Sequence, residues 1–168
     1  PQFLDWTALY KKAGALDSSI VKLAFIFVLV GYGTKAGLAP MHTWLPDAHT
    51  DAPTAGSVML AGSLIKMGGY GIIRICVSFF PDVAKHYSLF FVILAVIGVI
   101  YGAALTLRQT DIKRMIAYSS VSHMGFVLLG LATLNTIGLD GAVLQMFSHG
   151  IIAGLLFGVV GRMVYDRT

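Results

Sequence analysis

Five long apolar stretches constrain the fold of this 168-residue chain more than any other feature. A bilayer core about 30 Å thick needs roughly 20 helical residues to cross it, and a backbone in lipid must satisfy its own hydrogen bonds. The sequence therefore predicts an all-α fold, a polytopic membrane helix bundle of about five transmembrane helices. The expected spans are residues 19–39, 53–77, 87–107, 112–133 and 139–165.

Charged side chains are scarce and lie mainly between the apolar stretches. They form 12% of the chain, about half of the quarter expected for a globular domain. The net charge of +4 comes from basic residues divided between span interiors and short connections, which indicates membrane topology and no nucleic-acid partner. The single cysteine, Cys76, offers no cluster for iron–sulfur or zinc. We therefore expect a lipid bilayer around the chain and no redox centre, cofactor or metal within it.

The first predicted span is broken near Pro40. Glycines precede this proline, and the polar segment HTWLPDAH follows at 42–49. Proline has no backbone N–H and disfavours helix in the residue before it, so backbone carbonyls near Lys35 are expected to be free at membrane depth. Residues 1–18 are interpreted as an extramembrane lead-in, and residues 19–168 as part of one transmembrane domain.

Four ionisable residues lie inside the predicted spans, on four different helices: Lys35, Lys66, His123 and His149. A charged group at the bilayer centre costs at least about 2.5 kcal/mol on insertion scales, so such residues usually face a bundle interior or a water-filled cavity. Lysine suits proton transfer because a second buried cation can displace its proton, and histidine gains or loses a proton near neutral pH. We predict that the four residues form a proton path.

Small and hydroxyl-bearing residues accompany these groups at helical spacing, which predicts hydrated surfaces that face inward. They are Gly62 and Ser63 near Lys66, Ser119 and Ser120 near His123, and Gln145 and Ser148 near His149.

The other ionisable residues in and around the spans are interpreted as structural. Lys22 and Arg74 lie near span ends and are expected to extend toward the headgroups. His42 and His49 are expected to be hydrogen-bonded loop residues. The connection after the third span is expected to face the cytoplasm. Its charged residues are expected to be topology anchors: Arg108, Asp111, Lys113 and Arg114.

Two other functional classes are compatible with these spans. His123 and His149, on two helices, fit the axial ligands of a b-type haem, although their serine-rich surroundings favour water. Broken helices with charges at mid-membrane also fit a generic secondary transporter. The properties of the residues alone do not exclude a secondary transporter.

Three runs of the sequence resemble the antiporter-like membrane subunits of complex I, the proton-pumping NADH:quinone oxidoreductase. Within that family the sequence of these runs is most similar to chain M, the subunit-four type. Multi-subunit cation/proton antiporters and proton-pumping membrane-bound hydrogenases share the HTWLPDAH core, so a subunit of either is the alternative. The runs are KAGLAPMHTWLPDAHTDAPTAGSVMLAGSLIKMGGYGIIR at 35–74, TDIKRMIAYSSVSHMGFVLLG at 110–130 and GAVLQMFSHGIIAGLLF at 141–157.

The resemblance implies a longer subunit of which this chain is a central fragment. The family's path lysines match Lys35 and Lys66, and its relay histidines match His123 and His149. The family also uses buried glutamates, which are expected outside this chain because none of its eight acidic residues is a Glu.

The resemblance also implies proton translocation coupled to quinone reduction elsewhere in the complex. The chain would then act as a subunit of an oxidoreductase whose FMN, iron–sulfur clusters and quinone belong to partner subunits. Expected partners are other membrane-arm subunits, including sister antiporter-like subunits, with quinone contacted only indirectly. The expected location is a bacterial plasma membrane or an equivalent energy-converting membrane.

Overall fold

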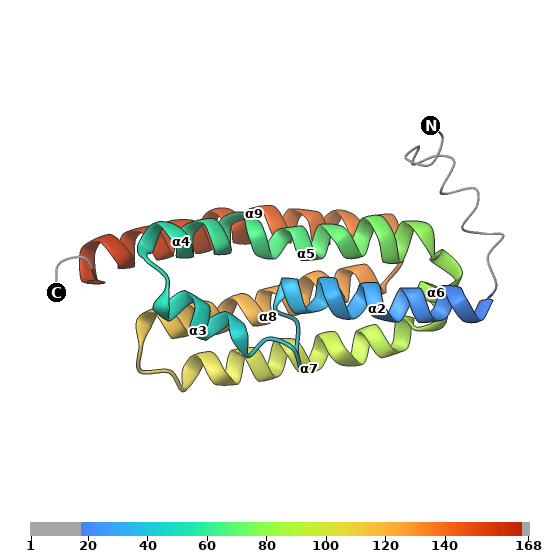
Figure 1. Ribbon diagram of the computed structural model, residues 1–168, viewed down its shortest axis with the longest axis horizontal. Helices are drawn as coiled ribbons and strands as arrows, with labels where there is room; N and C mark the ends of the chain where they lie inside the picture. Colours follow the sequence, from blue (N-terminus) through green and yellow to red (C-terminus); the bar gives the residue numbers. More distant parts are fainter. Residues whose placement is uncertain (1–17, 166–168) are drawn as a thin grey trace.

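The apolar stretches form helices that run along the long axis of the molecule (Figure 1). The computed structural model describes residues 18–165. Four consecutive segments from Thr54 to Val77 follow one another without a break and form one long helix with two π-helical parts, labelled η. The elements are α2 (Ser18–Ala36), α3 (Trp44–Asp51), α4 (Thr54–Met59), η2 (Leu60–Leu64), α5 (Ile65–Gly71), η3 (Ile72–Val77), α6 (Pro81–His86), α7 (Ser88–Leu107), α8 (Ile112–Ala132), α9 (Thr136–Val160) and η4 (Gly161–Tyr165).

Five helices within the described range are long and apolar enough to cross a membrane, which confirms the predicted bundle. Their boundaries differ from the prediction by a few residues. The first span ends at Ala36. The last begins at Thr136 because Asn135 caps it, accepting a hydrogen bond of 2.7 Å from the backbone N–H of Gly138. Residues 1–17 of the predicted lead-in lie outside the described residues, whereas Ser18 begins α2.

The predicted break near Pro40 is present between α2 and α3. α2 ends at Ala36, and Gly37 follows with φ at +68°, a left-handed conformation that suits glycine. An added Cβ at Gly37 would lie 2.9 Å from Cδ2 of Leu45, so this side chain would have to shift to admit a larger residue. Two carbonyls near the break are not free, in contrast to the expectation. The carbonyl of Gly33 accepts from the backbone N–H of Leu38 at 3.0 Å, and that of Thr34 accepts from Nε1 of Trp44 at 2.8 Å.

The segment after the break is a helix and not the expected loop. α3 begins at Trp44, so His49 lies on a helix, whereas His42 stays in the connection. The connection passes close to α7, and α3 then lies beside α8 (Figure 1). An exposed ion pair between Arg114 of α8 and Asp47 of α3 joins the two helices.

α8 lies at the centre of the bundle, since 56% of its span is buried, against 22% for the spans of α2, α7 and α9. Glycines let its neighbours approach closely. A Cβ added at Gly102 of α7 would lie 2.7 Å from the backbone nitrogen of Ser122 in α8. α2 and α5 meet in the same way, because a Cβ at Gly68 would lie 2.6 Å from the nitrogen of Ala36.

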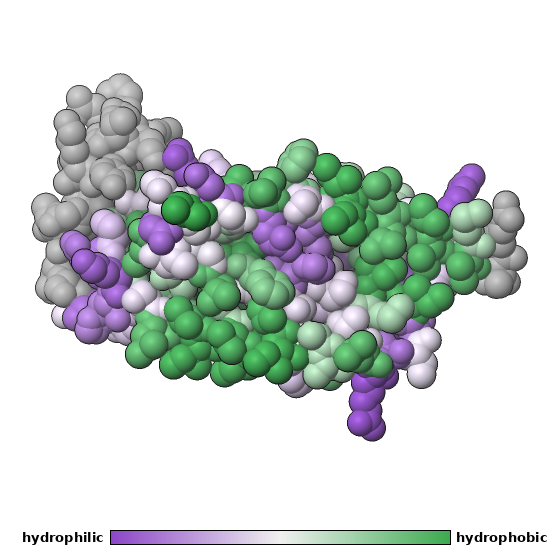
Figure 2. Space-filling model, turned by 180° about the vertical axis from the view of Figure 1, so that it is seen from behind, coloured by the Kyte–Doolittle hydropathy of each residue, from purple (hydrophilic) through white to green (hydrophobic). Residues whose placement is uncertain are grey.

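The outer surface is largely apolar, as a lipid or helix contact requires. Leu89, Ile137 and Leu144 are among the large hydrophobic residues that are exposed. Figure 2 shows extended hydrophobic regions on one face, with a hydrophilic patch near the middle of that face. Polar groups are thus present midway along the bundle as well as at its ends.

Candidate functional site

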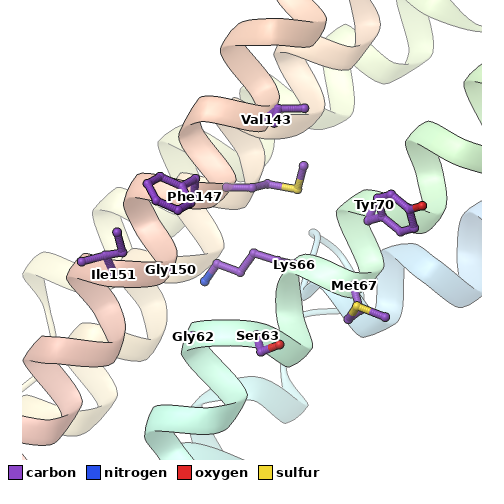
Figure 3. A pocket seen from close by; sticks show the side chains of 10 residues that line it. Gly62, Ser63, Lys66, Met67, Tyr70, Val143, Phe147, Gly150 and Ile151 are labelled. Atoms are coloured by element: carbon purple, nitrogen blue, oxygen red, sulfur yellow. The ribbon is translucent and has the colours of Figure 1, made fainter.

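Lys66 reaches from α5 toward α9 across a groove between the two helices (Figure 3). The groove has a volume of about 520 Å³. Gly62 and Gly150 leave space in it, and the end of the Lys66 side chain lies beside Gly150 (Figure 3). The Lys66 ammonium group donates to the backbone carbonyl of Ala61, in the π-helical segment η2 that precedes α5. Such irregular turns are frequent at functional sites.

His149 lies on α9 and is buried, with 3% of its surface exposed. Its Nε2 is 3.2 Å from the hydroxyl oxygen of Ser120 on α8. Its Nδ1 is buried and has no hydrogen-bond partner among the described residues. One ring nitrogen is therefore engaged by α8, while the other is left without a hydrogen bond among the described residues.

His123 lies on α8 and meets His149 directly. The centroids of the two rings are 4.9 Å apart, and their planes are tilted by 37°. Nε2 of Gln145 donates a hydrogen bond of 3.0 Å to Nδ1 of His123. The charge of Lys66 lies close enough to act electrostatically on both imidazoles. The structure thus brings together three of the four predicted path residues, from α5, α8 and α9.

The polar partners cross between helices, which sequence spacing did not indicate. Ser120, expected beside His123 on its own helix, contacts His149 instead. Gln145, expected beside His149, contacts His123. Each histidine is therefore oriented by a residue of the neighbouring helix.

Lys35 is the predicted path residue that lies apart. It occupies the last turn of α2, is exposed, and lines a second groove of about 420 Å³ together with Arg74. Met67 and Tyr70 line both grooves and separate the two lysines. None of the residues that line the second groove is acidic. Lys35 is thus adjacent to the Lys66 group but outside it.

Two residues interpreted as structural from the sequence are deeply buried near this site. His49 has none of its surface exposed, and its ring stacks on Phe157 with centroids 4.2 Å apart. Lys113 is 6% exposed, and its ammonium group lies 4.5 Å from the centre of the Tyr165 ring. Helical periodicity contained the signal for Lys113, because it lies seven residues before the buried Ser120 on the same face of α8.

His42, expected as a loop residue, lies in the connection between α2 and α3 and is buried. Tyr101 and Tyr118 meet its ring edge-on, at centroid distances of 5.4 and 6.3 Å. The ring of His42 therefore packs the connection between α2 and α3 against α7 and α8.

The geometry disfavours the haem interpretation. The rings of His123 and His149 lie against each other, which leaves no space for a porphyrin between them. Within residues 18–165, no group of three or more His, Cys, Asp or Glu is placed to hold a metal ion. What the site offers is a set of proton donors and acceptors in contact.

Comparisons with known proteins identify the family of the chain. Residues 4–168 match the family described as NADH:quinone oxidoreductase/Mrp antiporter, TM. The chain is 43% identical over 163 residues to "NADH-quinone oxidoreductase subunit M" of Rickettsia prowazekii, covering 97% of this chain and 33% of that protein. It is 51% identical over 146 residues to "NAD(P)H-quinone oxidoreductase chain 4 2" of Thermosynechococcus vestitus, covering 87% and 27%. These names agree with the predicted chain M type.

Two solved structures share the fold. The Mrp complex from a Dietzia species superposes with a TM-score of 0.84 at 26% identity, over 91% of this chain and 29% of the matched chain. Respiratory complex I from Thermus thermophilus with bound NADH gives 0.79 at 28% identity, over 86% and 31%. The chain thus spans about a third or less of the length of these relatives. From its sequence and its fold, the chain belongs to the NADH:quinone oxidoreductase/Mrp antiporter transmembrane family.

Proposed function

We propose that this chain is the central part of a proton-translocating, antiporter-like membrane subunit of an NADH:quinone oxidoreductase. The observation that carries the proposal is the ring contact between His123 of α8 and His149 of α9, with Lys66 of α5 close enough to act electrostatically on both rings. An ionisable side chain within a membrane span costs free energy, so residues in such positions usually have a function.

The proposed transfer begins at Lys66. Its ammonium group gives a proton to a neutral imidazole of the histidine pair, and the lysine becomes a neutral amine. An imidazole that accepts a proton on one nitrogen can release another from the second nitrogen. Because His123 and His149 are in ring contact, the proton passes between them by a short step, with Gln145 and Ser120 holding the rings in place.

Lys35 is proposed to control Lys66 by charge. The two lysines line neighbouring grooves with Met67 and Tyr70 between them. Two cations in surroundings of low dielectric repel each other strongly. When Lys35 loses an acidic partner supplied by another helix of the complete subunit, its charge pushes the proton of Lys66 toward the histidines.

The electron chemistry is proposed to reside in partner subunits that hold FMN, iron–sulfur clusters and quinone. The relatives named above are subunits of quinone oxidoreductases, and a solved relative belongs to respiratory complex I. The direct partners would be other membrane-arm subunits, including sister antiporter-like subunits. Quinone reduction would then act on this chain only through those neighbours.

The alternative function is that of a subunit in a cation/proton antiporter, which the TM-score of 0.84 with an Mrp complex favours. The lysine argues for protons as the ion that this site carries, because an ammonium group repels sodium and offers it no oxygen ligand. Sealed membrane vesicles separate the two functions. When a sodium gradient is imposed without an electron donor, an antiporter moves protons in the direction opposite to sodium and changes the internal pH, whereas a respiratory pump moves protons only when the donor is present.

The test of the proposal uses the complete complex in sealed vesicles. Lys66→Ala and Lys35→Ala are each expected to abolish or strongly reduce donor-driven proton translocation, measured with a pH-sensitive dye beside the rate of electron transfer. Lys85→Ala, at an exposed lysine of α6, is the control and should pump normally. Normal pumping by a fully assembled Lys66→Ala complex would refute the proposal.

A further inference from the structure

His49 has an unusual environment for a buried polar side chain. Both of its ring nitrogens are inaccessible and have no hydrogen-bond partner among the described residues. Its backbone carbonyl is engaged, since the hydroxyl of Ser57 donates to it at 3.1 Å. Buried polar groups are nearly always hydrogen-bonded, so a ring with two free nitrogens requires an explanation.

Packing explains the position of the ring but not its nitrogens. His49 lies flat on Phe157 of α9, with centroids 4.2 Å apart and planes only 7° from parallel. A phenylalanine would fill the same place and make the same stacking contact without burying two polar atoms. The imidazole is therefore costly as a purely structural choice.

Two lysines on different helices act on His49. Lys66 of α5 and Lys113 of α8 both lie close enough to act electrostatically on its ring. α9 contributes the apolar Phe157. The segment around His49 contacts the helices of both lysines, because Ser57, in the long helix that continues to Lys66, donates to the His49 carbonyl, and Lys113 donates to the carbonyl of Ala52.

Lys113 lies in the first turn of α8, at the end of that helix. Its ammonium group donates to the carbonyl of Ala52, the residue that follows α3, at 3.4 Å. It also lies over the ring of Tyr165. The hydroxyl of Tyr165 donates to Asp111, in the connection before α8, at 2.9 Å. Polar groups therefore continue from Lys113 to the connection between α7 and α8.

We propose that His49 is a further proton-carrying residue, which links Lys66 to Lys113 and so to the end of the bundle at Asp111. This inference rests on the proposed function of Lys66. In each transfer the imidazole accepts a proton on one nitrogen and releases a proton from the other, so the ring returns to its neutral form. No bond other than N–H is made or broken, and no electron is transferred.

Two substitutions separate proton transfer from packing. His49→Phe keeps the stacking on Phe157 but removes both nitrogens, and His49→Gln keeps a polar side chain but cannot carry a proton at neutral pH. In the complete complex in sealed vesicles, each is expected to lower the rate of donor-driven proton translocation by about tenfold or more, the scale of a lost acid–base group. His86→Phe, at an exposed histidine of α6, is the matched control and should pump as the unmodified complex does.

The outcomes are distinct. A His49→Phe complex that assembles and pumps normally would overturn the inference and assign the ring to packing. If that variant fails to assemble, His49→Gln decides in the same assay. Lys66→Ala is measured beside them. Loss of pumping in Lys66→Ala with normal pumping in both His49 variants would reject the role of His49 alone, whereas normal pumping in Lys66→Ala would reject the proposed function itself.

Discussion

The rings of His123 and His149 lie in contact across the interface of α8 and α9, with centroids 4.9 Å apart and a tilt of 37°. Neither helix could orient its own histidine in this way, because the hydrogen bonds that hold the rings come from the opposite helix in both cases. The pair is therefore a property of the interface, and we expect it to depend on the residues that orient the two rings.

Gln145→Leu tests this dependence. The substitution removes the donor to Nδ1 of His123 and replaces the amide by an apolar side chain of similar size. We expect proton translocation to fall by roughly three- to tenfold, because a lost hydrogen bond is worth about 1 kcal/mol and leaves the ring less well oriented. Ser148→Ala is the control, since within residues 18–165 the Ser148 hydroxyl bonds only to its own helix, at the carbonyls of Leu144 and Gln145. Equal pumping by both variants in vesicles would show that Gln145 does not position His123.

The length of the apolar stretches was enough to predict the membrane helices, because few structures other than helices satisfy the backbone hydrogen bonds of such a stretch within lipid. The break was predictable from Pro40 for a similarly local reason. Helix pairing was not predictable in the same way. Which faces meet depends on contacts such as Gly102 against Ser122, and these involve residues distant in sequence.

The same limit applied to the site. Burial cost identified Lys66, His123 and His149, since charge inside an apolar run is visible in the sequence. His49 was missed because its segment is polar and bounded by prolines, which is typical of a loop. Only the packing of α3 beside α8 and against Phe157 makes it an interior residue.

Gly68→Ala is expected to weaken the contact between α2 and α5. An added Cβ would lie 2.6 Å from the backbone nitrogen of Ala36 and 2.7 Å from the carbonyl oxygen of Tyr32, and backbone atoms cannot move aside cheaply. Overpacking of this kind costs about 1–3 kcal/mol, so thermal denaturation of the purified complex should begin at a lower temperature. Gly31→Ala, where nothing lies within 4 Å, is the control. An unchanged melting temperature for Gly68→Ala would contradict the close approach.

Asp111 gives a prediction of pH dependence outside the spans. Burial raises the pKa of Asp111, but hydrogen bonds from the backbone N–H of Arg114 and the hydroxyl of Tyr165 outweigh this effect and hold it below the ordinary value of 3.8. A carboxylate with a lowered folded-state pKa stabilises the fold above its unfolded pKa, and this stabilisation is lost as the pH falls through the folded pKa.

Asp111→Asn should therefore lower the thermal stability of the complex at pH 7, by about 1 kcal/mol or less because asparagine also caps helices. The difference from the unmodified complex should shrink as the pH falls below about 4, because the carboxylate of the unfolded chain becomes protonated before that of the folded chain. Asp140→Asn, at an exposed residue of α9, should show no such difference. A stability gap for Asp111→Asn that stays constant across this pH range would exclude the charge as its cause.

Arg108 and Lys113 lie on either side of the connection between α7 and α8, and their surroundings differ. Arg108 is exposed at the end of α7, whereas Lys113 is buried beneath Tyr165. Arg108→Gln is therefore expected to leave proton translocation and turnover largely unchanged. Lys113→Met, which keeps an unbranched side chain of similar length, should reduce translocation because it removes the charge that His49 meets. Both are measured in vesicles with equal amounts of assembled complex. An inactive but assembled Arg108→Gln complex would show that Arg108 is more than a topology anchor, and normal pumping by Lys113→Met would remove Lys113 from the path.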